Sequence, residues 1–223
     1  KLYVENEMTS QWTAIDNNVE TVTLELERIV QERGESLGAI ESDPALNQAI
    51  LSGVMDELVG ALRTCGATEI FLVLDGPATQ QEDMRAGVYL RNMSPDFYSK
   101  GNENLLFERG MPALSKQWRI SLDSFWTAGF QLKQGDPNSA YFFEPLQAAR
   151  NSDNTSAENF AYWCYSYPIH TSDHGILSYS IPLIASDGTV VGVMGVGVSE
   201  DHFSKTMDYT ELGGDHTGAY VLA

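Results

Sequence analysis

Hydrophobic residues recur with a regular period near the start of the chain. They stand at alternating intervals of four and three positions, which is the heptad spacing of one face of an amphipathic helix. Acidic and other polar residues fill the positions between them, and Gly34 stands where such a helix can end. The sequence therefore predicts one long helix, whose heptad stripe consists of Met8, Trp12, Ile15, Val19, Val22, Leu26 and Ile29.

The heptad stripe is compatible with two arrangements. It can pack along the chain's own domain, as the apolar face of a surface helix does. It can also pair with the same stripe of a second copy, which would make the protein a homodimer through its N-terminal helix. Both arrangements can hold along different stretches of the helix, so the pattern leaves the choice open.

A second helical period, over residues 43–63, is followed by two strand-like segments. The helix opens with an Asp–Pro pair, a favourable N-terminus, and apolar residues then repeat every four positions. Residues 69–75 are almost entirely apolar, and residues 87–93 alternate as an antiparallel neighbour would. In this alternation Tyr89 and Arg91 share one face of the second strand.

The middle of the chain is turn-rich, and the pattern there is weaker. It predicts a helical stretch around 111–131 and a strand over 161–169. Near the end it predicts a short helix over 201–209 and a strand over 218–223. Because the strands cluster without alternating with helices, the fold class is α+β, with an antiparallel sheet flanked by helices.

Two apolar runs, 177–183 and 190–198, predict a β-hairpin around an Asp–Gly turn. The glycines of the second run lie inside a strand, whereas a dinucleotide-binding loop needs G-x-G-x-x-G between a strand and a helix. Gly195 and Gly197 share one face of the strand, which indicates that another group approaches the backbone closely. That group is either the long N-terminal helix or a bound small molecule.

The charge balance restricts the possible partners. The 223 residues include 31 acidic and 13 basic ones, and the formal net charge is −18. Such a charge repels nucleic acids and anionic lipid surfaces, so nucleic-acid binding is not expected. No run of eighteen apolar residues occurs, so no bilayer-spanning segment is predicted.

The sequence carries no recognisable catalytic or metal-binding motif. Cys65 and Cys164 lack the spacing of a metal or redox motif, and free buried thiols are favoured over a bridge between them. His170 and His174 stand four apart, but the neighbouring proline and glycine place them in a surface loop rather than on one helix face. No nucleophile elbow, calcium-binding loop or phosphate-binding loop occurs. We therefore expect neither an enzyme nor a cofactor.

Aromatic residues are unusually dense between positions 141 and 179. Core packing accounts for many of them, but small-molecule pockets are lined in the same way, by apolar walls with a few polar groups. On a strand, Tyr162 and Cys164 share one face, while Trp163 and Tyr165 share the other. We expect one of these pairs to face a cavity.

Several of these segments together resemble a known family. The long helix, the strand pair at 69–75 and 87–93, and above all SYSIPLIASDGTVVGVMGVGVSEDHF at 178–203 are similar to the membrane-distal module of double Cache domains, the PAS-like sensors of bacteria. In that family an apolar strand ending in proline is followed by a DG turn, a GVxGV strand and a helix. The resemblance covers residues 5–223.

The resemblance implies a domain organisation and a function. Residues 1–42 would form a signalling helix, 43–200 a PAS/Cache-like sensor module, and 201–223 a connecting helix and the first strand of a truncated membrane-proximal module. The protein would be the extracellular or periplasmic sensing part of a membrane-anchored bacterial receptor, such as a diguanylate cyclase, histidine kinase or chemoreceptor. Its partner would be a small organic ligand.

The family's amino-acid-binding pattern is absent. No Arg-x-Trp-Tyr run occurs, the Tyr-x-Asp region reads YPIH at 167–170, and Gly197 stands where the family has an Asp that binds the ligand amine. A standard amino acid is therefore not the expected ligand, and an uncharged, acidic or aromatic compound is favoured. Arg91 would form a charged hydrogen bond with an acidic group. The residues expected to line the pocket are Tyr89, Arg91, Trp126, Tyr162, Trp163, Tyr165 and Tyr179.

The heptad stripe supports an alternative function. The module would then bind no ligand and would serve as a dimerisation or protein-interaction scaffold of such a receptor. Dimerisation through residues 8–29 distinguishes this interpretation from the sensor.

Overall fold

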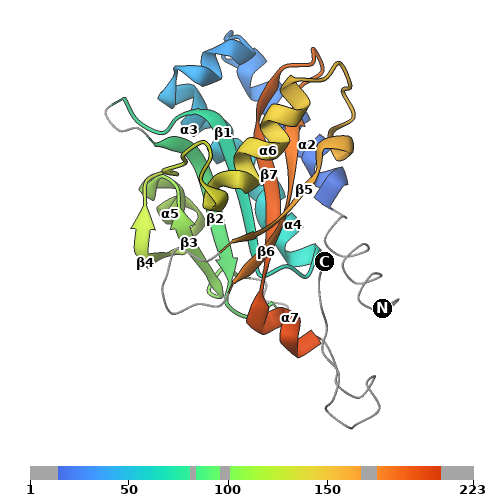
Figure 1. Cartoon of the computed structure of the whole chain (residues 1–223). Coiled ribbons are helices and arrows are strands. Elements are labelled where there is room, and N and C mark those ends of the chain that lie inside the picture. The colour runs from blue at the N-terminus through green and yellow to red at the C-terminus, as the bar shows by residue number, and fades with distance from the viewer. Residues whose placement is uncertain (1–14, 81–83, 96–100, 167–174, 207–223) are drawn as a thin grey trace.

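The computed structural model describes residues 15–80, 84–95, 101–166 and 175–206, which form one seven-stranded sheet with helices on both faces (Figure 1). The strand order is β4-β3-β2-β1-β7-β6-β5. The strands are β1 (Glu69–Pro77), β2 (Arg85–Asn92), β3 (Leu105–Arg109), β4 (Ser121–Thr127), β5 (Tyr162–Ser166), β6 (Ile176–Ile184) and β7 (Val190–Ser199). The α-helices are α2 (Ile15–Glu32), α3 (Pro44–Gly53), α4 (Met55–Thr64), α5 (Pro112–Trp118), α6 (Ala140–Arg150) and α7 (Glu200–Thr206). Three short 3-10 helices complete the described chain: η2 (Leu37–Glu41), η3 (Pro137–Ser139) and η4 (Ala157–Phe160).

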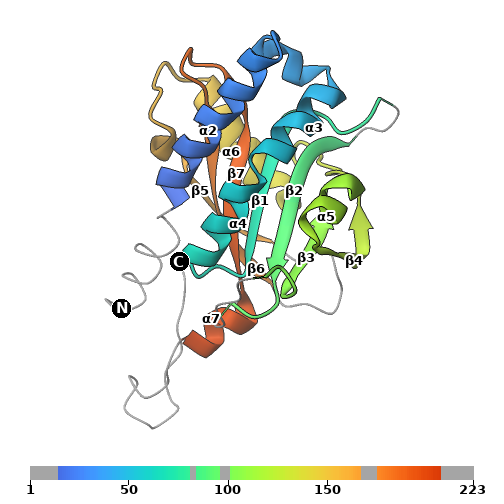
Figure 2. The same cartoon turned by 180° about the vertical axis from the view of Figure 1, so that it is seen from behind.

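Different helices cover the two faces of the sheet. Helices α2, α3 and α4 lie over one face, here called the α2 face (Figure 2). Helix α6 lies over the opposite face, here called the α6 face (Figure 1). Along β1 the even-numbered residues Ile70, Leu72 and Leu74 enter the α2-face core, while Phe71 and Val73 join the α6-face core. The strand thus reads as a continuous apolar run because both of its faces are covered.

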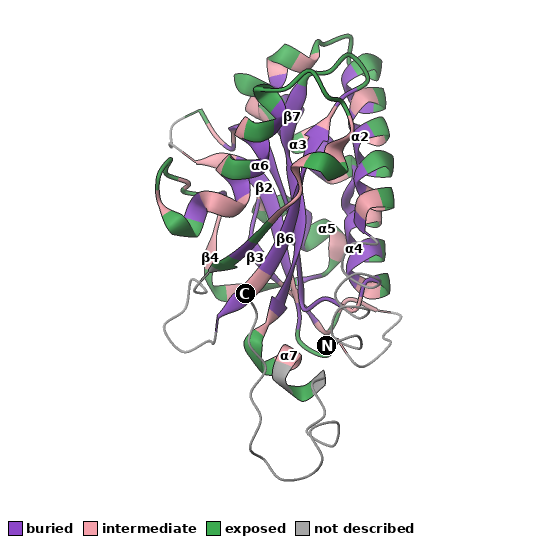
Figure 3. Cartoon of the chain, turned by 45° about the vertical axis from the view of Figure 1, so that its right-hand side comes forward, coloured by how far each residue is buried: buried purple, intermediate pink, exposed green. Residues whose placement is uncertain are grey.

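The described part of the heptad stripe packs on the chain's own core. Its members from Ile15 to Ile29 are all buried, and α2 contacts α3, α4 and β6. Figure 3 shows this inner side of α2 in the buried colour and the outer side in the exposed one. The first of the two arrangements therefore holds over α2. Met8 and Trp12 lie outside the described residues, and the homodimer stays a prediction.

Several predicted elements are confirmed by the structure. β1 pairs antiparallel with β2, and β6 pairs with β7 as a hairpin whose turn contains Gly188 at a φ of 87°. The strand expected over 161–169 is β5, described as far as Ser166, and the helix expected near 201 is α7. The strand expected over 218–223 lies outside the described residues. Cys65 and Cys164 are both free and buried, as expected.

Other expectations about the fold were wrong. The sheet is mixed rather than antiparallel, because β3 and β4 run parallel. The helix expected around 111–131 stops at Trp118, where Arg119 takes a left-handed φ of 54°, and β4 follows. The helix expected over 43–63 is two helices, because Val54 leaves the helical geometry at ψ 4°.

Gly195 and Gly197 are approached by a neighbouring strand, β1, rather than by the N-terminal helix. β1 pairs with β7 so that Phe71 lies opposite Gly195 and Glu69 opposite Gly197. A Cβ atom on Gly195 would overlap Cζ of Phe71, and one on Gly197 would lie 2.8 Å from Oε2 of Glu69. The glycines therefore make room for the side chains of β1 on the α6 face.

A charged clamp fixes α6 to the sheet. Asp75 of β1 accepts a hydrogen bond from Arg85 of β2 and forms an ion pair of 2.6 Å with Arg150 at the end of α6. The guanidinium of Arg85 also lies 5.0 Å from the ring centroid of Phe142. These contacts hold α6 at one end of the α6 face.

Candidate functional site

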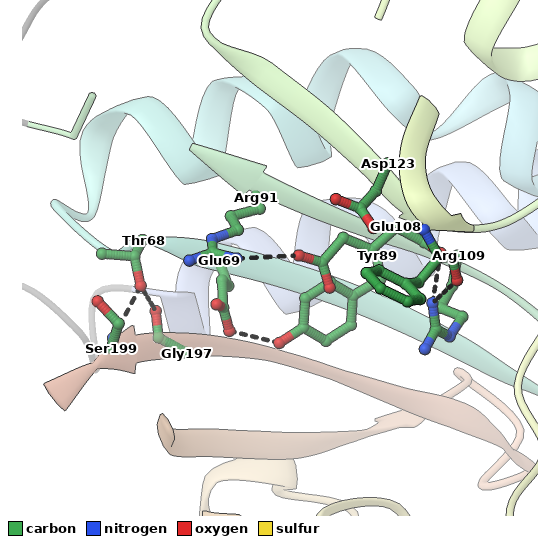
Figure 4. A network of polar contacts seen from close by, with 10 residues as sticks. Thr68, Glu69, Tyr89, Arg91, Glu108, Arg109, Asp123, Gly197 and Ser199 are labelled. Atoms are coloured by element: carbon green, nitrogen blue, oxygen red, sulfur yellow. Dashed lines mark hydrogen bonds and ion pairs between the residues drawn. The ribbon is translucent and has the colours of Figure 1, made fainter. Parts of the chain in front are cut away.

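Five polar side chains form a row across three adjacent strands on the α6 face (Figure 4). This polar row consists of Glu69 of β1, Tyr89 and Arg91 of β2, and Glu108 and Arg109 of β3. Glu69 pairs with Arg91 in the sheet register, and Tyr89 pairs with Arg109, so strand pairing makes four of the five residues neighbours. All except Arg91 are at most 9% exposed. Buried charged groups are rare unless they are paired, so this row marks a specialised place in the fold.

A β-bulge brings the two β3 members of the polar row onto one face. Tyr89 pairs with Arg109 and Leu90 pairs with Phe107, so the register shifts and Glu108 is an extra residue in β3. Such a bulge interrupts the strict alternation of side chains. Glu108 and Arg109 can therefore both approach Tyr89, although they are consecutive in sequence.

The hydroxyl of Tyr89 donates a hydrogen bond to Oε2 of Glu69 inside this row. Burial, together with the negative charge of Glu69, raises the pKa of Tyr89 well above its ordinary value. The ring of Tyr89 stacks on that of Phe71 at a centroid distance of 5.9 Å, and Tyr141 of α6 meets Phe71 edge-on at 4.9 Å. Burial also raises the pKa of Tyr141. The phenol of Tyr89 is thus held neutral as a hydrogen-bond donor.

The two arginines of the row are held in different ways. Nη1 of Arg91 lies 3.6 Å from Oε1 of Glu108. Arg109 donates to the backbone carbonyls of Glu108 at 2.6 Å and of Phe125 at 3.2 Å. Burial lowers the pKa of Arg109 from its ordinary value, against the nearby charge of Glu108. The row combines two carboxylates with two guanidiniums, so it offers both acceptors and donors to a polar molecule.

An acidic group occupies the space beside Gly197 after all. The carboxylate of Glu69 on the neighbouring strand lies against this glycine. Position 197 itself carries no acid, but the neighbouring strand brings the carboxylate of Glu69 to the same place. That the ligand is not a standard amino acid stays a prediction.

The structure divides the predicted pocket residues between the two faces of the sheet. Tyr89 and Arg91 belong to the polar row on the α6 face. Tyr162 pairs with Ser180 of β6, which pairs in turn with Gly195, so strand pairing places it on that same face. Three of the seven predicted residues therefore share the α6 face.

The other four predicted residues lie elsewhere. Trp163 and Tyr179 are cross-strand partners whose ring centroids are 4.7 Å apart, and Tyr179 belongs to the α2-face core. The Tyr179 hydroxyl donates to Oδ1 of Asp16 of α2 at 3.4 Å. Tyr165 shares the face of Trp163 by alternation. Trp126 donates its ring N–H to the carbonyl of Gly110 and packs against the α2-face core.

Three members of the polar row were missed in the sequence. Glu69 opens a strand that was predicted, and the pairing of that strand with residues 87–93 could have placed it beside Arg91. Glu108 and Arg109 gave no such signal, because β3 was not predicted and a bulge leaves no mark in the sequence pattern.

The described residues contain no group of three or more His, Cys, Asp or Glu side chains that could hold a metal ion. His170 and His174 lie outside the described residues. Over the same part of the chain, no helix is both long and apolar enough to cross a membrane.

No protein-family model matches this chain, and a search of curated proteins found no match to it. The resemblance to double Cache domains therefore depends on the sequence motifs and stays a prediction.

Proposed function

We propose that this chain is the small-molecule sensing domain of a bacterial transmembrane signalling protein, facing the extracellular or periplasmic side. The buried polar row on the α6 face carries the proposal, because clustered, buried charges next to aromatic walls are typical of ligand sites. The sequence motifs add support for a PAS-like, double Cache type of sensor with the domain division given above. In this proposal the chain has no catalytic activity of its own.

We place the ligand on the α6 face, beside Tyr89, Arg91 and Tyr162. There Arg91 binds an acidic or other acceptor group of the ligand, in competition with Glu108 at 3.6 Å. Tyr89, whose O–H is donated to Glu69, accepts a hydrogen bond from the ligand. The four predicted residues outside this face are left out of the site. Amino acids belong in a ligand screen together with organic acids and aromatic compounds, because Glu69 brings a carboxylate next to Gly197.

A thermal-shift screen with single metabolites tests the proposal. A ligand at a hundred times its dissociation constant stabilises the folded state by about 2.7 kcal/mol, which corresponds to a rise in Tm of about 5–10 °C for a domain of this size. Arg91→Ala should abolish this rise. Arg33→Ala, which removes an exposed arginine just after α2, should leave it unchanged and serves as the matched control.

Two outcomes would contradict the sensor proposal. One is that no compound in the screen stabilises the wild-type domain. The other is that a compound stabilises Arg91→Ala and Tyr89→Phe as strongly as the wild type, which would move the ligand away from the polar row.

The alternative proposal, a dimerisation scaffold, keeps its support only from the first part of the heptad stripe. The members within α2 are buried in the chain itself, which leaves Met8 and Trp12. Sedimentation at varied protein concentration tests this alternative. A scaffold should dimerise, and Trp12→Glu should make it monomeric.

A further inference from the structure

The junction between β7 and α7 lies beside the polar row. β7 ends at Ser199 and α7 begins at Glu200, so the two elements are continuous. Thr68 directly precedes β1, and its neighbour Glu69 is a member of the polar row. Figure 4 shows Thr68, Gly197 and Ser199 next to the pair formed by Glu69 and Tyr89.

Thr68 binds β7 through both its backbone and its side chain. Its N–H and its hydroxyl donate to the carbonyl of Gly197, at 3.0 Å and 3.2 Å. The same hydroxyl oxygen accepts a hydrogen bond of 2.9 Å from the N–H of Ser199. Thr68 is buried, so these bonds are shielded from competition with water. They extend the pairing of β1 and β7 to the last residue before α7.

Ser199 in turn caps α7. Its hydroxyl oxygen accepts a hydrogen bond of 3.3 Å from the N–H of His202, three residues further on, which is the geometry of a serine N-cap. Ser199 is therefore bound through its N–H to Thr68 and through its side chain to the helix. A displacement of Ser199 would disturb the first turn of α7.

Gly197 connects this junction to the polar row. Its carbonyl accepts hydrogen bonds from Thr68. The carboxylate of Glu69, which accepts a hydrogen bond from Tyr89, lies next to the Cα atom of Gly197. A change in the position or charge of Glu69 therefore acts on Gly197, three residues before the start of α7.

We infer that the hydroxyl of Thr68 couples the polar row to helix α7. A change at Glu69 alters the hold of Thr68 on Gly197 and Ser199, and this changes the stability of the first turn of α7. As a means of transmitting ligand binding, the inference depends on the proposed function. The coupling itself is present without a ligand and can be measured without one.

The first test compares amide hydrogen exchange in the wild type with that in Thr68→Val and Thr68→Ser. Valine keeps the shape of threonine but cannot accept from Ser199, whereas serine keeps the hydroxyl. Thr68→Val should accelerate exchange at Ser199 and His202 by about three- to tenfold, as for the loss of one net hydrogen bond. Thr68→Ser should resemble the wild type. Equal exchange in the two variants would overturn the inference.

The second test is a double-mutant cycle with Glu69→Gln, which removes the charge while keeping the shape of the side chain. Glu69→Gln should change exchange in α7 in the wild-type background and leave it unchanged in the Thr68→Val background. The same change in both backgrounds, or no change in either, would refute the coupling. Ser199→Ala provides a second route if Thr68→Val does not fold, because it should loosen α7 while the amide of Ser199 stays protected.

The two tests contain no ligand, so their outcome is independent of the metabolite screen. If the coupling is measured but no ligand is found, only the proposed sensor function is refuted. If a ligand is found but no coupling is measured, only the role of Thr68 is refuted.

Discussion

Replacing Gly195 by alanine should destabilise the fold strongly, because the added methyl group has no space. Its Cβ would overlap the ring of Phe71 and lie 2.5 Å from the carbonyl oxygen of Tyr179. The Phe71 ring is buried between Tyr89 and Tyr141, and the carbonyl belongs to β6, which pairs with β7. Neither neighbour can move without disturbing further contacts.

The expected cost follows from the behaviour of overpacked cores. Inserting a methyl group into a well-packed interior costs about 1–3 kcal/mol, and we expect the upper end here because one of the two neighbours is backbone. For a domain of this size, about 3 kcal/mol lowers Tm by about 6–12 °C. Urea unfolding followed by tryptophan fluorescence should show a lower midpoint with an unchanged slope.

Gly60→Ala is the matched control. Gly60 lies within α4, and a Cβ atom there would have no heavy atom within 4 Å. The same substitution should therefore stabilise the protein by about 0.5–1 kcal/mol, through helix propensity and a less flexible unfolded chain.

A second variant separates the two contacts at Gly195. Phe71→Leu removes the ring, so Gly195→Ala should cost less in that background than in the wild type, with the contact to the Tyr179 carbonyl remaining. The reasoning fails if Gly195→Ala is as stable as the wild type while Gly60→Ala behaves as expected.

Two further predictions concern single charges. Burial raises the pKa of Asp16 in the folded protein, so the folded state favours the protonated carboxyl. Asp16 therefore makes the protein more stable at pH 3, where it is protonated, and this stability is lost as the pH rises through the raised pKa. Asp16→Asn still accepts a hydrogen bond from Tyr179. It should be more stable than the wild type at pH 7, by only about 0.5 kcal/mol because the group is partly exposed, and equally stable at pH 3, as thermal unfolding can measure. Asp75→Ala removes the carboxylate that both arginines of the charged clamp share. It should lower the free energy of unfolding by about 1–3 kcal/mol in urea unfolding. The exposed control, Asp153→Ala, should cause no measurable change. A loss of the same size in both variants would contradict a role for the clamp.

The elements that the sequence predicted well are those in which local pattern and tertiary environment agree. The β6–β7 hairpin has alternating residues around an Asp–Gly turn, and the turn takes the positive φ that Gly188 permits. The stripe of α2 is regular, and its described members are buried. The heptad period accounts for five of the seven buried residues that α2 has, and the β-hairpin is buried on both faces of the sheet.

The elements that were missed depend on tertiary packing. β3 is short and carries Glu108 and Arg109, two charged residues that are buried only because the polar row surrounds them. Helix α6 contains Pro145 and consecutive aromatic residues, which weaken its helical signal. The candidate site depends on the pairing of β1, β2 and β3. The alternation of residues within one strand does not show which strand lies beside it or in which register the two strands pair.

The pairing of β1 with β7 has a consequence for how the chain folds during synthesis. β1 occupies a central place in the sheet, yet its partner β7 is encoded near the other end of the described chain. Until β7 has emerged from the ribosome, the apolar segment from Ile70 to Leu74 has one edge whose backbone hydrogen bonds are not yet formed. Such late, long-range closure slows folding and exposes a strand that can aggregate. The nascent chain should therefore depend on chaperones during translation, and truncation before Val190 should give insoluble protein.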